Sequence, residues 1–265
     1  MFKKRILIVE PHPDDGAIKA GGTIAKMTRE GHEAYFLTIA DGERGSMDRT
    51  VTSPEQIRKI LREEGIRGSK ILGGVEDTFL GYPNHEIMPH LEIELRQKIM
   101  EVIRRLKPNI VMTYDPYGLY EGNPDHRTVA LATYDAVSFS QHHLDLPDQV
   151  AKFGTHLVDE LWFFATPNPN LTVDVTETIW TKAKAMAAYK SPMESMLEEV
   201  KQRLRLAGLQ SSYLESGQLE EILMKFFATQ YEDGRYVEKF KVIRPFISER
   251  VPHLLSEGLI EPIRE

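Results

Sequence analysis

The chain has 265 residues, of which 41% are hydrophobic and 28% are charged, so it can bury a large core and does not belong to the disordered class of proteins. Its 40 acidic and 33 basic side chains give a formal net charge of −7, which argues against nucleic acid or an anionic membrane surface as a partner. It contains no Cys, which excludes disulfides, thiol nucleophiles, thiolate zinc sites and iron–sulfur clusters, so a metal ion would need His, Asp, Glu or carbonyl ligands.

The N-terminal segment predicts a buried strand and no targeting signal. The apolar run at 6–9 is continuous and contains β-branched residues, as in a strand that is covered on both faces of a sheet. It reaches Glu10 too soon to be the apolar core of a signal peptide. No apolar run in the chain approaches the roughly 20 residues that cross a bilayer. We therefore expect a cytoplasmic protein with no membrane span.

Strand and helix patterns then alternate through the first half of the chain. Apolar runs predict further strands at 34–40, 70–72 and 109–114. Helical spacing of apolar residues predicts helices at 17–29, 53–64 and 91–106. Ser53 followed by Pro54 is a favourable start for the second of these helices.

The second half continues this alternation to about residue 190 and then changes. Helices are predicted at 123–139 and 177–189, strands at 161–165 and 171–175, and, beyond residue 190, helices at 193–208 and 218–228 and a strand at 236–244. Helices between successive strands favour a parallel sheet with right-handed crossovers. We therefore expect an α/β protein with a Rossmann-like three-layer fold and a mainly parallel sheet. Residues 1–190 are expected to form its core, and residues 191–265 a C-terminal appendage of helices and a strand within the same domain.

Polar loops follow three of the predicted strands, at the sheet edge where open parallel sheets bind their ligands. The first loop contains His12, Asp14 and Asp15, and a later one leads to His126. His12, Asp15 and His126 can supply the three N and O ligands of a catalytic zinc site, which keeps an open position for water. The same set of two His and one carboxylate is also used for iron(II). Zinc is preferred because nothing in the sequence indicates oxygen chemistry or a redox cofactor.

Each of these residues also has an ordinary structural interpretation. His12 can simply lie in a turn, and Asp14 or Asp15 can cap the following helix, where a carboxylate also suits the helix dipole. Asn123 suits the N-cap of a later helix, which would leave His126 as a first-turn residue with no ligand role. The metal interpretation is favoured because all of these residues lie at the same edge of the predicted sheet.

Several short motifs occur in a fixed order over residues 5–190. They are Pro11-His12-Pro13-Asp14-Asp15, Ala20-Gly21-Gly22-Thr23-Ile24, Gly31-His32-Glu33, Asp41-Gly42-Glu43 and Asn123-Pro124-Asp125-His126-Arg127. This set resembles the LmbE-like (PIG-L type) zinc-dependent N-deacetylases. Together with Asp115-Pro116 and Ser138-Phe139-Ser140-Gln141, it looks closest to the archaeal diacetylchitobiose deacetylases.

The resemblance implies a reaction and a role for several residues. His12, Asp15 and His126 would hold Zn²⁺, and Asp14 would act as the general base. The implied reaction is hydrolytic removal of an acetyl group from an N-acetylamino sugar similar to chitobiose or N-acetylglucosamine, or from a related N-acyl compound. Asp115 would orient the site or contact the substrate. The family also implies homo-oligomers, trimers or hexamers, in which residues beyond 190 supply contacts or a lid.

Two residues depart from the family pattern in a way that bears on the reaction. Asn123 stands where the family usually has a His that donates to the oxyanion and can act as an acid, whereas Asn donates a neutral hydrogen bond and cannot deliver a proton. If the enzyme is active, Asp14 must then accept the proton of water and also pass one to the leaving nitrogen. Asn84 stands where the family tends to have an Asp that contacts a substrate hydroxyl. Arg44 either meets a hydroxyl, carboxylate or phosphate of the substrate or is a solvated loop charge.

The neutral Asn123 and Asn84 keep a second function open. The protein would then be a catalytically weakened family member that retains its metal and binds a sugar or regulates a partner. A metal-dependent phosphoesterase is disfavoured. Such an enzyme would use a two-metal site, which usually needs several carboxylates, whereas the three candidate ligands include only one.

Overall fold

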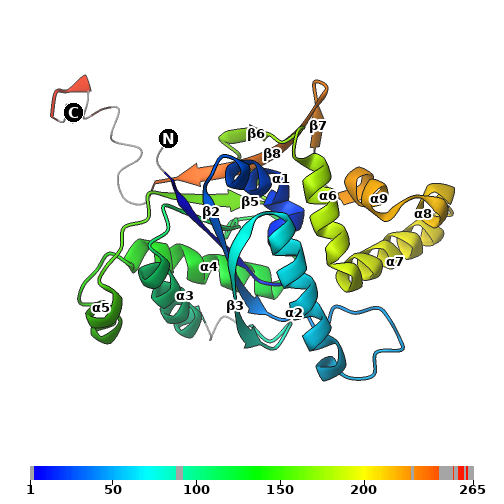
Figure 1. The fold of residues 1–265 in the computed structure, drawn as a ribbon, viewed down its shortest axis with the longest axis horizontal. Coiled ribbons are helices and arrows are strands. Elements are labelled where there is room, and N and C mark those ends of the chain that lie inside the picture. Colours follow the sequence, from blue (N-terminus) through cyan, green and yellow to red (C-terminus); the bar gives the residue numbers. More distant parts are fainter. Residues whose placement is uncertain are drawn as a thin grey trace.

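The centre of the fold is a sheet whose strand order runs outward in both directions from its first strand. The computed structural model describes residues 3–87, 92–227, 230–244, 253, 256–259 and 261. The strands in this part of the chain are β1 (Arg5–Glu10), β2 (Glu33–Ala40), β3 (Gly74–Tyr82), β4 (Ile110–Tyr114), β5 (Glu160–Phe164), β6 (Leu171–Asp174), β7 (Gln230–Glu232) and β8 (Arg235–Ile243). They form one sheet in the order β3-β2-β1-β4-β5-β8-β6, with β7 paired to β8 (Figure 1). Strands β1 to β5 pair in parallel, and β8 pairs antiparallel with β5, β6 and β7.

Helices cover both faces of this sheet. They are α1 (Asp15–Arg29), α2 (Pro54–Ile71), α3 (Glu92–Leu106), α4 (Pro124–Phe139), α5 (Pro147–Phe153), α6 (Ile179–Ala188), α7 (Lys190–Leu206), α8 (Ser212–Ser216) and α9 (Leu219–Phe227). Because side chains alternate between the faces of a strand, Ile6 and Ile8 of β1 lie in a buried cluster with α1 and α6, and Leu7 and Val9 lie in a second one with α3 and α4. The predicted three-layer α/β fold with a mainly parallel sheet is confirmed.

The strand predicted at 70–72 is wrong. Lys70 and Ile71 are the last two residues of α2, and Leu72 caps that helix. Gly73 then turns the chain with a φ of 87°, and the third strand, β3, follows it. The apolar Leu72 packs in the core at the end of the helix and not in a strand. β3 is the outermost strand of the sheet, its side chains are mostly only partly buried, and it carries no continuous apolar run that would predict it.

Three short elements have no counterpart in the prediction, namely α5, α8 and β7. Leu91 and Ala228, where two predicted helices begin and end, lie outside the described residues. In the described part of the chain, none of the helices combines the length and the apolar composition needed to cross a membrane.

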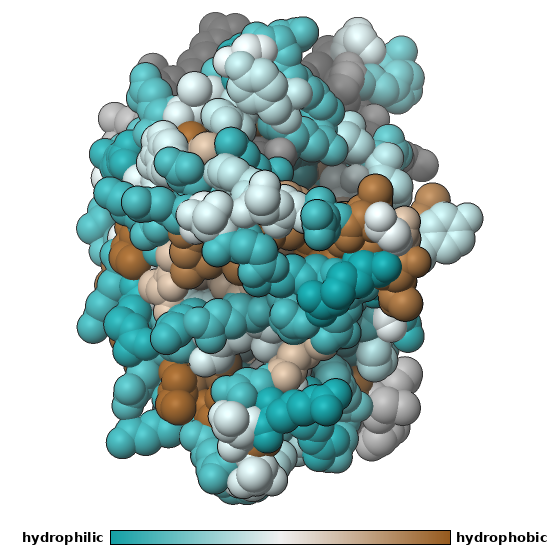
Figure 2. Space-filling model, turned by 90° about the vertical axis from the view of Figure 1, so that its right-hand side faces the viewer, coloured by the Kyte–Doolittle hydropathy of each residue, from teal (hydrophilic) through white to brown (hydrophobic). Residues whose placement is uncertain are grey.

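Helices α7 to α9 stand together at one end of the sheet, on the right in Figure 1. Seen from that end, the surface is mostly hydrophilic, with hydrophobic patches between the polar side chains (Figure 2). Helix α6 connects this end to the rest of the fold, because it packs against α1, α2 and α9. The start of α7 lies close to the carboxyl end of β1, where α1 begins.

A buried ion pair joins the C-terminal strand to two helices. Lys182 of α6 and Glu238 of β8 are 1% and 2% exposed, and Lys182 Nζ donates to Glu238 Oε1 at 2.7 Å. The same carboxylate accepts the backbone N–H groups of Gly22 and Thr23 in α1, at 3.0 and 2.8 Å. Glu238 therefore fixes β8, α1 and α6 to one another.

Replacing Glu238 with Ala should destabilise the fold strongly, because it would leave the Lys182 ammonium buried without its carboxylate. We expect a loss of about 3–5 kcal/mol in the free energy of unfolding. Chemical denaturation followed by circular dichroism measures this loss. Glu232→Ala is the matched control, since Glu232 pairs with Lys239 at the surface and should change stability by less than about 1 kcal/mol. Equal stabilities of the two variants would contradict the prediction.

Candidate metal centre

The candidate site lies where the strand order reverses, at the carboxyl ends of β1 and β4. Strand β1 leads to His12 and then to Asp15 at the first position of α1. Strand β4 ends at Tyr114, and the loop after it leads to His126 in the first turn of α4. β1 and β4 are neighbours in the sheet, so the two loops meet at one edge although they are far apart in the sequence.

Three side chains place donor atoms around a common point. His126 Nε2 lies 3.4 Å from His12 Nδ1, and Asp15 turns one oxygen toward each ring, with Oδ2 3.3 Å from His12 Nδ1 and Oδ1 3.6 Å from His126 Nε2. Ligand atoms about 2.1 Å from a tetrahedral zinc ion lie about 3.4 Å from one another. The two imidazole nitrogens are at this separation, and one carboxylate oxygen completes a set of three donors within 4.8 Å, so the predicted triad His12, Asp15 and His126 suits a zinc ion.

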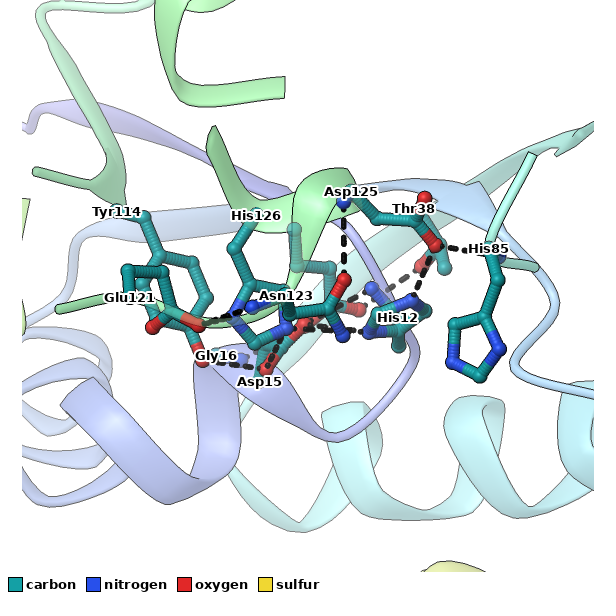
Figure 3. A network of polar contacts seen from close by, with 11 residues as sticks. His12, Asp15, Gly16, Thr38, His85, Tyr114, Glu121, Asn123, Asp125 and His126 are labelled. Atoms are coloured by element: carbon teal, nitrogen blue, oxygen red, sulfur yellow. Dashed lines mark hydrogen bonds and ion pairs between the residues drawn. The ribbon is translucent and has the colours of Figure 1, made fainter. Parts of the chain in front are cut away.

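Two further residues hold His12 and Asp15, the candidate ligands on the β1 side, in place. The buried Asp125 accepts a hydrogen bond from Nε2 of His12 at 3.0 Å, which leaves Nδ1 of that ring facing the ligand cluster (Figure 3). The Tyr114 hydroxyl donates to Asp15 Oδ1 at 2.6 Å. A carboxylate behind a ligating His and a donor on a ligating carboxylate are the usual outer contacts of a metal site.

His126 is held on both sides. Its ring stacks on that of Tyr114, with centroids 4.1 Å apart and an interplanar angle of 21°. Its Nδ1 lies 3.3 Å from Oε1 of Glu121. The same Glu121 oxygen accepts the backbone N–H of Asn123 at 2.9 Å, so this carboxylate also fixes the loop before α4.

The charges of the cluster favour a cation. Burial lowers the pKa of His12, but its hydrogen bonds with Asp125 and Asp15 outweigh this effect and raise the pKa to about 10. Burial raises the pKa of Asp15, but the charge of His126 and the hydrogen bond with His12 hold it well below its usual range. Because a ligating imidazole must be neutral, metal uptake would displace a proton from His12.

Asp14 lies beside the cluster, and its side chain makes no hydrogen bond or ion pair with another side chain among the described residues. It occupies the N-cap position of α1, yet its side chain forms no capping hydrogen bond. Burial and the charge of Asp15 raise the pKa of Asp14 to about 7. It lines a cavity of about 420 Å³ together with the three metal-binding candidates. Its side chain is thus available to a ligand in this cavity.

Comparisons with known proteins give the family. A family model described as PIG-L, GlcNAc-PI de-N-acetylase, matches residues 7–137. A diacetylchitobiose deacetylase of Thermococcus kodakarensis is 36% identical over 189 residues, which cover 71% of this chain and 70% of that relative. The chain belongs to the PIG-L family. The resemblance inferred from the motifs is thereby confirmed.

Two further matches agree with the PIG-L assignment. A 1D-myo-inositol 2-acetamido-2-deoxy-alpha-D-glucopyranoside deacetylase of Streptomyces griseus is 30% identical over 175 residues, or 56% of this chain and 54% of that relative. The structure of N,N′-diacetylchitobiose deacetylase from Pyrococcus horikoshii superposes with a TM-score of 0.71 at 24% identity, over 94% of this chain and 89% of that one. The second match shows that the two proteins share a fold.

Two other predicted site residues of this PIG-L protein line the same cavity. Asn123 caps α4, because its Oδ1 accepts the backbone N–H of Asp125 at 2.9 Å, so the capping interpretation holds for this residue. Its Nδ2 has no hydrogen-bond partner among the described residues. Asn84 is 2% exposed, and its Oδ1 is buried with no partner in the described part of the chain.

The remaining two predicted residues are placed differently. Arg44 is exposed and forms an ion pair with Glu86. Asp115 accepts the backbone N–H of Tyr117 at 2.8 Å and so shapes the turn after β4. Neither is among the described residues that line the cavity. Their substrate contacts stay predictions.

Several residues of the site were given no role from the sequence. Asp125 belongs to one of the motifs, and Tyr114 is the last residue of a predicted strand, so both positions were expected near the carboxyl ends of the strands. Glu121 lies in the loop before α4, and no pattern in the sequence marked it as a site residue. His85 also lines the cavity, and its spacing matched no other ligand.

Replacing Tyr114 with Phe should weaken metal binding while the fold is retained, because only the hydroxyl on Asp15 is lost. Loss of such an outer contact reduces metal affinity by about 10- to 100-fold. Competition with a chromogenic chelator measures the zinc affinity of the purified protein. Tyr35→Phe is the matched control, since the Tyr35 hydroxyl bonds Glu33 at the opposite end of the sheet. An unchanged affinity in Tyr114→Phe would contradict this role.

Proposed function

We propose that the protein is a zinc-dependent hydrolase that removes the acetyl group from an N-acetylamino sugar, similar to diacetylchitobiose or N-acetylglucosamine, or from a related N-acyl compound. The observation that carries the proposal is the triad of His12, Asp15 and His126, whose donor atoms all lie within 4.8 Å of one another, beside the carboxylate of Asp14, which makes no capping bond. The relatives from Thermococcus kodakarensis and Streptomyces griseus are both named as deacetylases of acetylated sugars.

The ligand triad and Asp14 have separate tasks in this reaction. His12, Asp15 and His126 would hold the zinc ion. When bound, zinc supplies a Lewis acid that polarises an acyl carbonyl and lowers the pKa of water. Asp14 is adjacent to the triad but makes no capping bond, so its carboxylate accepts the proton of the attacking water. Attack on the amide carbon and breakage of the C–N bond release acetate and a primary amine.

The amide of Asn123 suits the stabilisation of the developing oxyanion. Its oxygen is fixed by the N–H of Asp125, which orients the amide and leaves the two N–H groups of Nδ2 for a ligand. A donor held in this way stabilises negative charge without rearranging during the reaction. The amide has no acidic proton to give, so this role excludes protonation of the leaving nitrogen by Asn123.

Asn84 suits recognition of a substrate hydroxyl. A buried oxygen without a hydrogen bond costs about 1–3 kcal/mol, which a donor from the substrate would recover. Oδ1 of Asn84 is such an oxygen among the described residues, and the side chain lines the cavity. Sugars are rich in hydroxyl donors, which supports a carbohydrate as the occupant.

The alternative function is a metal-containing protein that binds an acetylated sugar without hydrolysing it. The neutral side chains of Asn123 and Asn84 favour it, because neither can transfer a proton. The two functions differ in one observable, the release of acetate.

The homo-oligomer implied by the family resemblance is part of the same proposal. Tyr117, Leu119 and Tyr120 project from the loop between β4 and α4, and the Tyr120 side chain is fully exposed. An apolar loop of this kind next to the site suits contact with a second copy of the chain. Size-exclusion chromatography with light scattering measures the oligomeric state.

The purified zinc-loaded protein should release acetate from diacetylchitobiose or N-acetylglucosamine, and a chelator should abolish the release. Asp14→Asn should reduce kcat by about 100- to 10,000-fold, because the amide cannot accept a proton, while the zinc content stays the same. Enzymatic detection of acetate and elemental analysis measure both quantities. Asp148→Asn, on the exposed helix α5, is the control.

Two results would overturn the proposal. One is full activity in Asp14→Asn. The other is sugar binding by calorimetry with no acetate formed from any member of the panel, which would favour the binding function instead.

A further inference from the structure

The proposed reaction has no side chain dedicated to protonating the leaving nitrogen. A departing amine must take up a proton as the C–N bond breaks. Asn123 cannot supply it, and without a second acid Asp14 would have to carry out both proton transfers, as expected from the sequence. An imidazole elsewhere in the cavity would fill this need, because His is the side chain that most often donates protons near neutral pH.

His85 is a histidine in this cavity that belongs to neither the triad nor its outer contacts. It lines the same cavity as Asp14 and Asn123. No hydrogen bond or ion pair engages its ring nitrogens in the described part of the chain. Figure 3 shows the ring directed past His12 rather than back toward Asp125, with no dashed line on either nitrogen. The ring is thus free to contact a ligand.

The backbone of His85 adopts a conformation that favours glycine. Its φ is 64°, in the left-handed region that non-glycine residues occupy infrequently. The N–H of His85 donates to Asp125 Oδ2 at 2.8 Å, and the same oxygen accepts Nε2 of His12 at 3.0 Å. One buried atom therefore positions both the ligand His12 and the backbone of His85. A strained residue held by the site's own carboxylate points to a role in that site.

We infer that His85 is a catalytic residue of this hydrolase, the proton donor to the leaving nitrogen. The inference rests on the proposed function. Asp14 takes one proton from the attacking water, and protonated His85 passes its proton to the amide nitrogen, directly or through one water, as the C–N bond breaks. The products are a neutral amine and acetic acid, which keeps the second proton of the water and loses it to solvent as acetate, with His85 left as neutral imidazole. Solvent then returns the Asp14 proton to His85, so no further reactant is required.

Two substitutions separate proton donation from a structural role. His85→Asn keeps a polar side chain that tolerates the left-handed backbone, and His85→Gly removes the ring and suits that backbone fully. Both variants should retain zinc affinity and melting temperature. Both should lose about 100- to 10,000-fold in kcat with KM changed by less than about threefold, because the lost interaction forms only during bond breakage.

Adding Asn123→His to the His85→Gly variant tests whether an imidazole at another position of the cavity can replace His85 as the proton donor. A new imidazole beside the leaving nitrogen should recover at least about tenfold of the lost kcat. His143→Asn, an exposed histidine outside the cavity-lining set, should leave kcat unchanged and serves as the matched control.

The outcomes are distinguishable. Wild-type kcat in both His85 variants, a loss confined to KM, or no gain from Asn123→His would overturn the inference while acetate release by the wild type upholds the proposed function. A wild type that forms no acetate would overturn both.

Discussion

A single buried carboxylate, that of Asp125, joins three loops at the ligand edge of the sheet. Its Oδ2 accepts the Nε2–H of His12 after β1 and the N–H of His85 after β3. Its own backbone N–H donates to Oδ1 of Asn123, at the start of α4. The residue is completely buried, so these contacts operate in a low-dielectric setting where losing one partner is costly. The orientation of His12 and the position of the loop that carries His85 depend on this one side chain.

The topology explains why the clustering of His12, Asp15 and His126 could be predicted from the sequence. Adjacent parallel strands end at one edge, so polar residues that follow buried strands must meet there, whatever their separation in the chain. His12, Asp15 and His126 satisfy this rule. The fold class followed from the same alternation of apolar runs and helical spacing. The edge strand β3 did not, because its partly exposed residues carry neither signal.

The rest of the site depends on orientations that residue order does not encode. Asp125 turns inward because Asn123 caps the helix and sets its first turn. Tyr114 ends a buried strand, but only the pairing of β4 with β1 brings its hydroxyl close to Asp15, which follows β1. His85 lies in a loop and has a left-handed backbone conformation. No periodicity of apolar residues in the sequence reveals such a conformation.

The ion pair of Lys182 and Glu238 links the C-terminal strand β8 to the helix that begins at the candidate metal centre. Glu238 accepts two backbone N–H groups in the middle of α1, and the first residue of that helix is Asp15 of the candidate triad. Removal of the chain beyond residue 190 would leave the Lys182 ammonium in the core without the Glu238 carboxylate, and α1 would lose its contacts with that carboxylate. The placement of the candidate metal centre therefore depends on β8 as well as on the segment that carries the motifs.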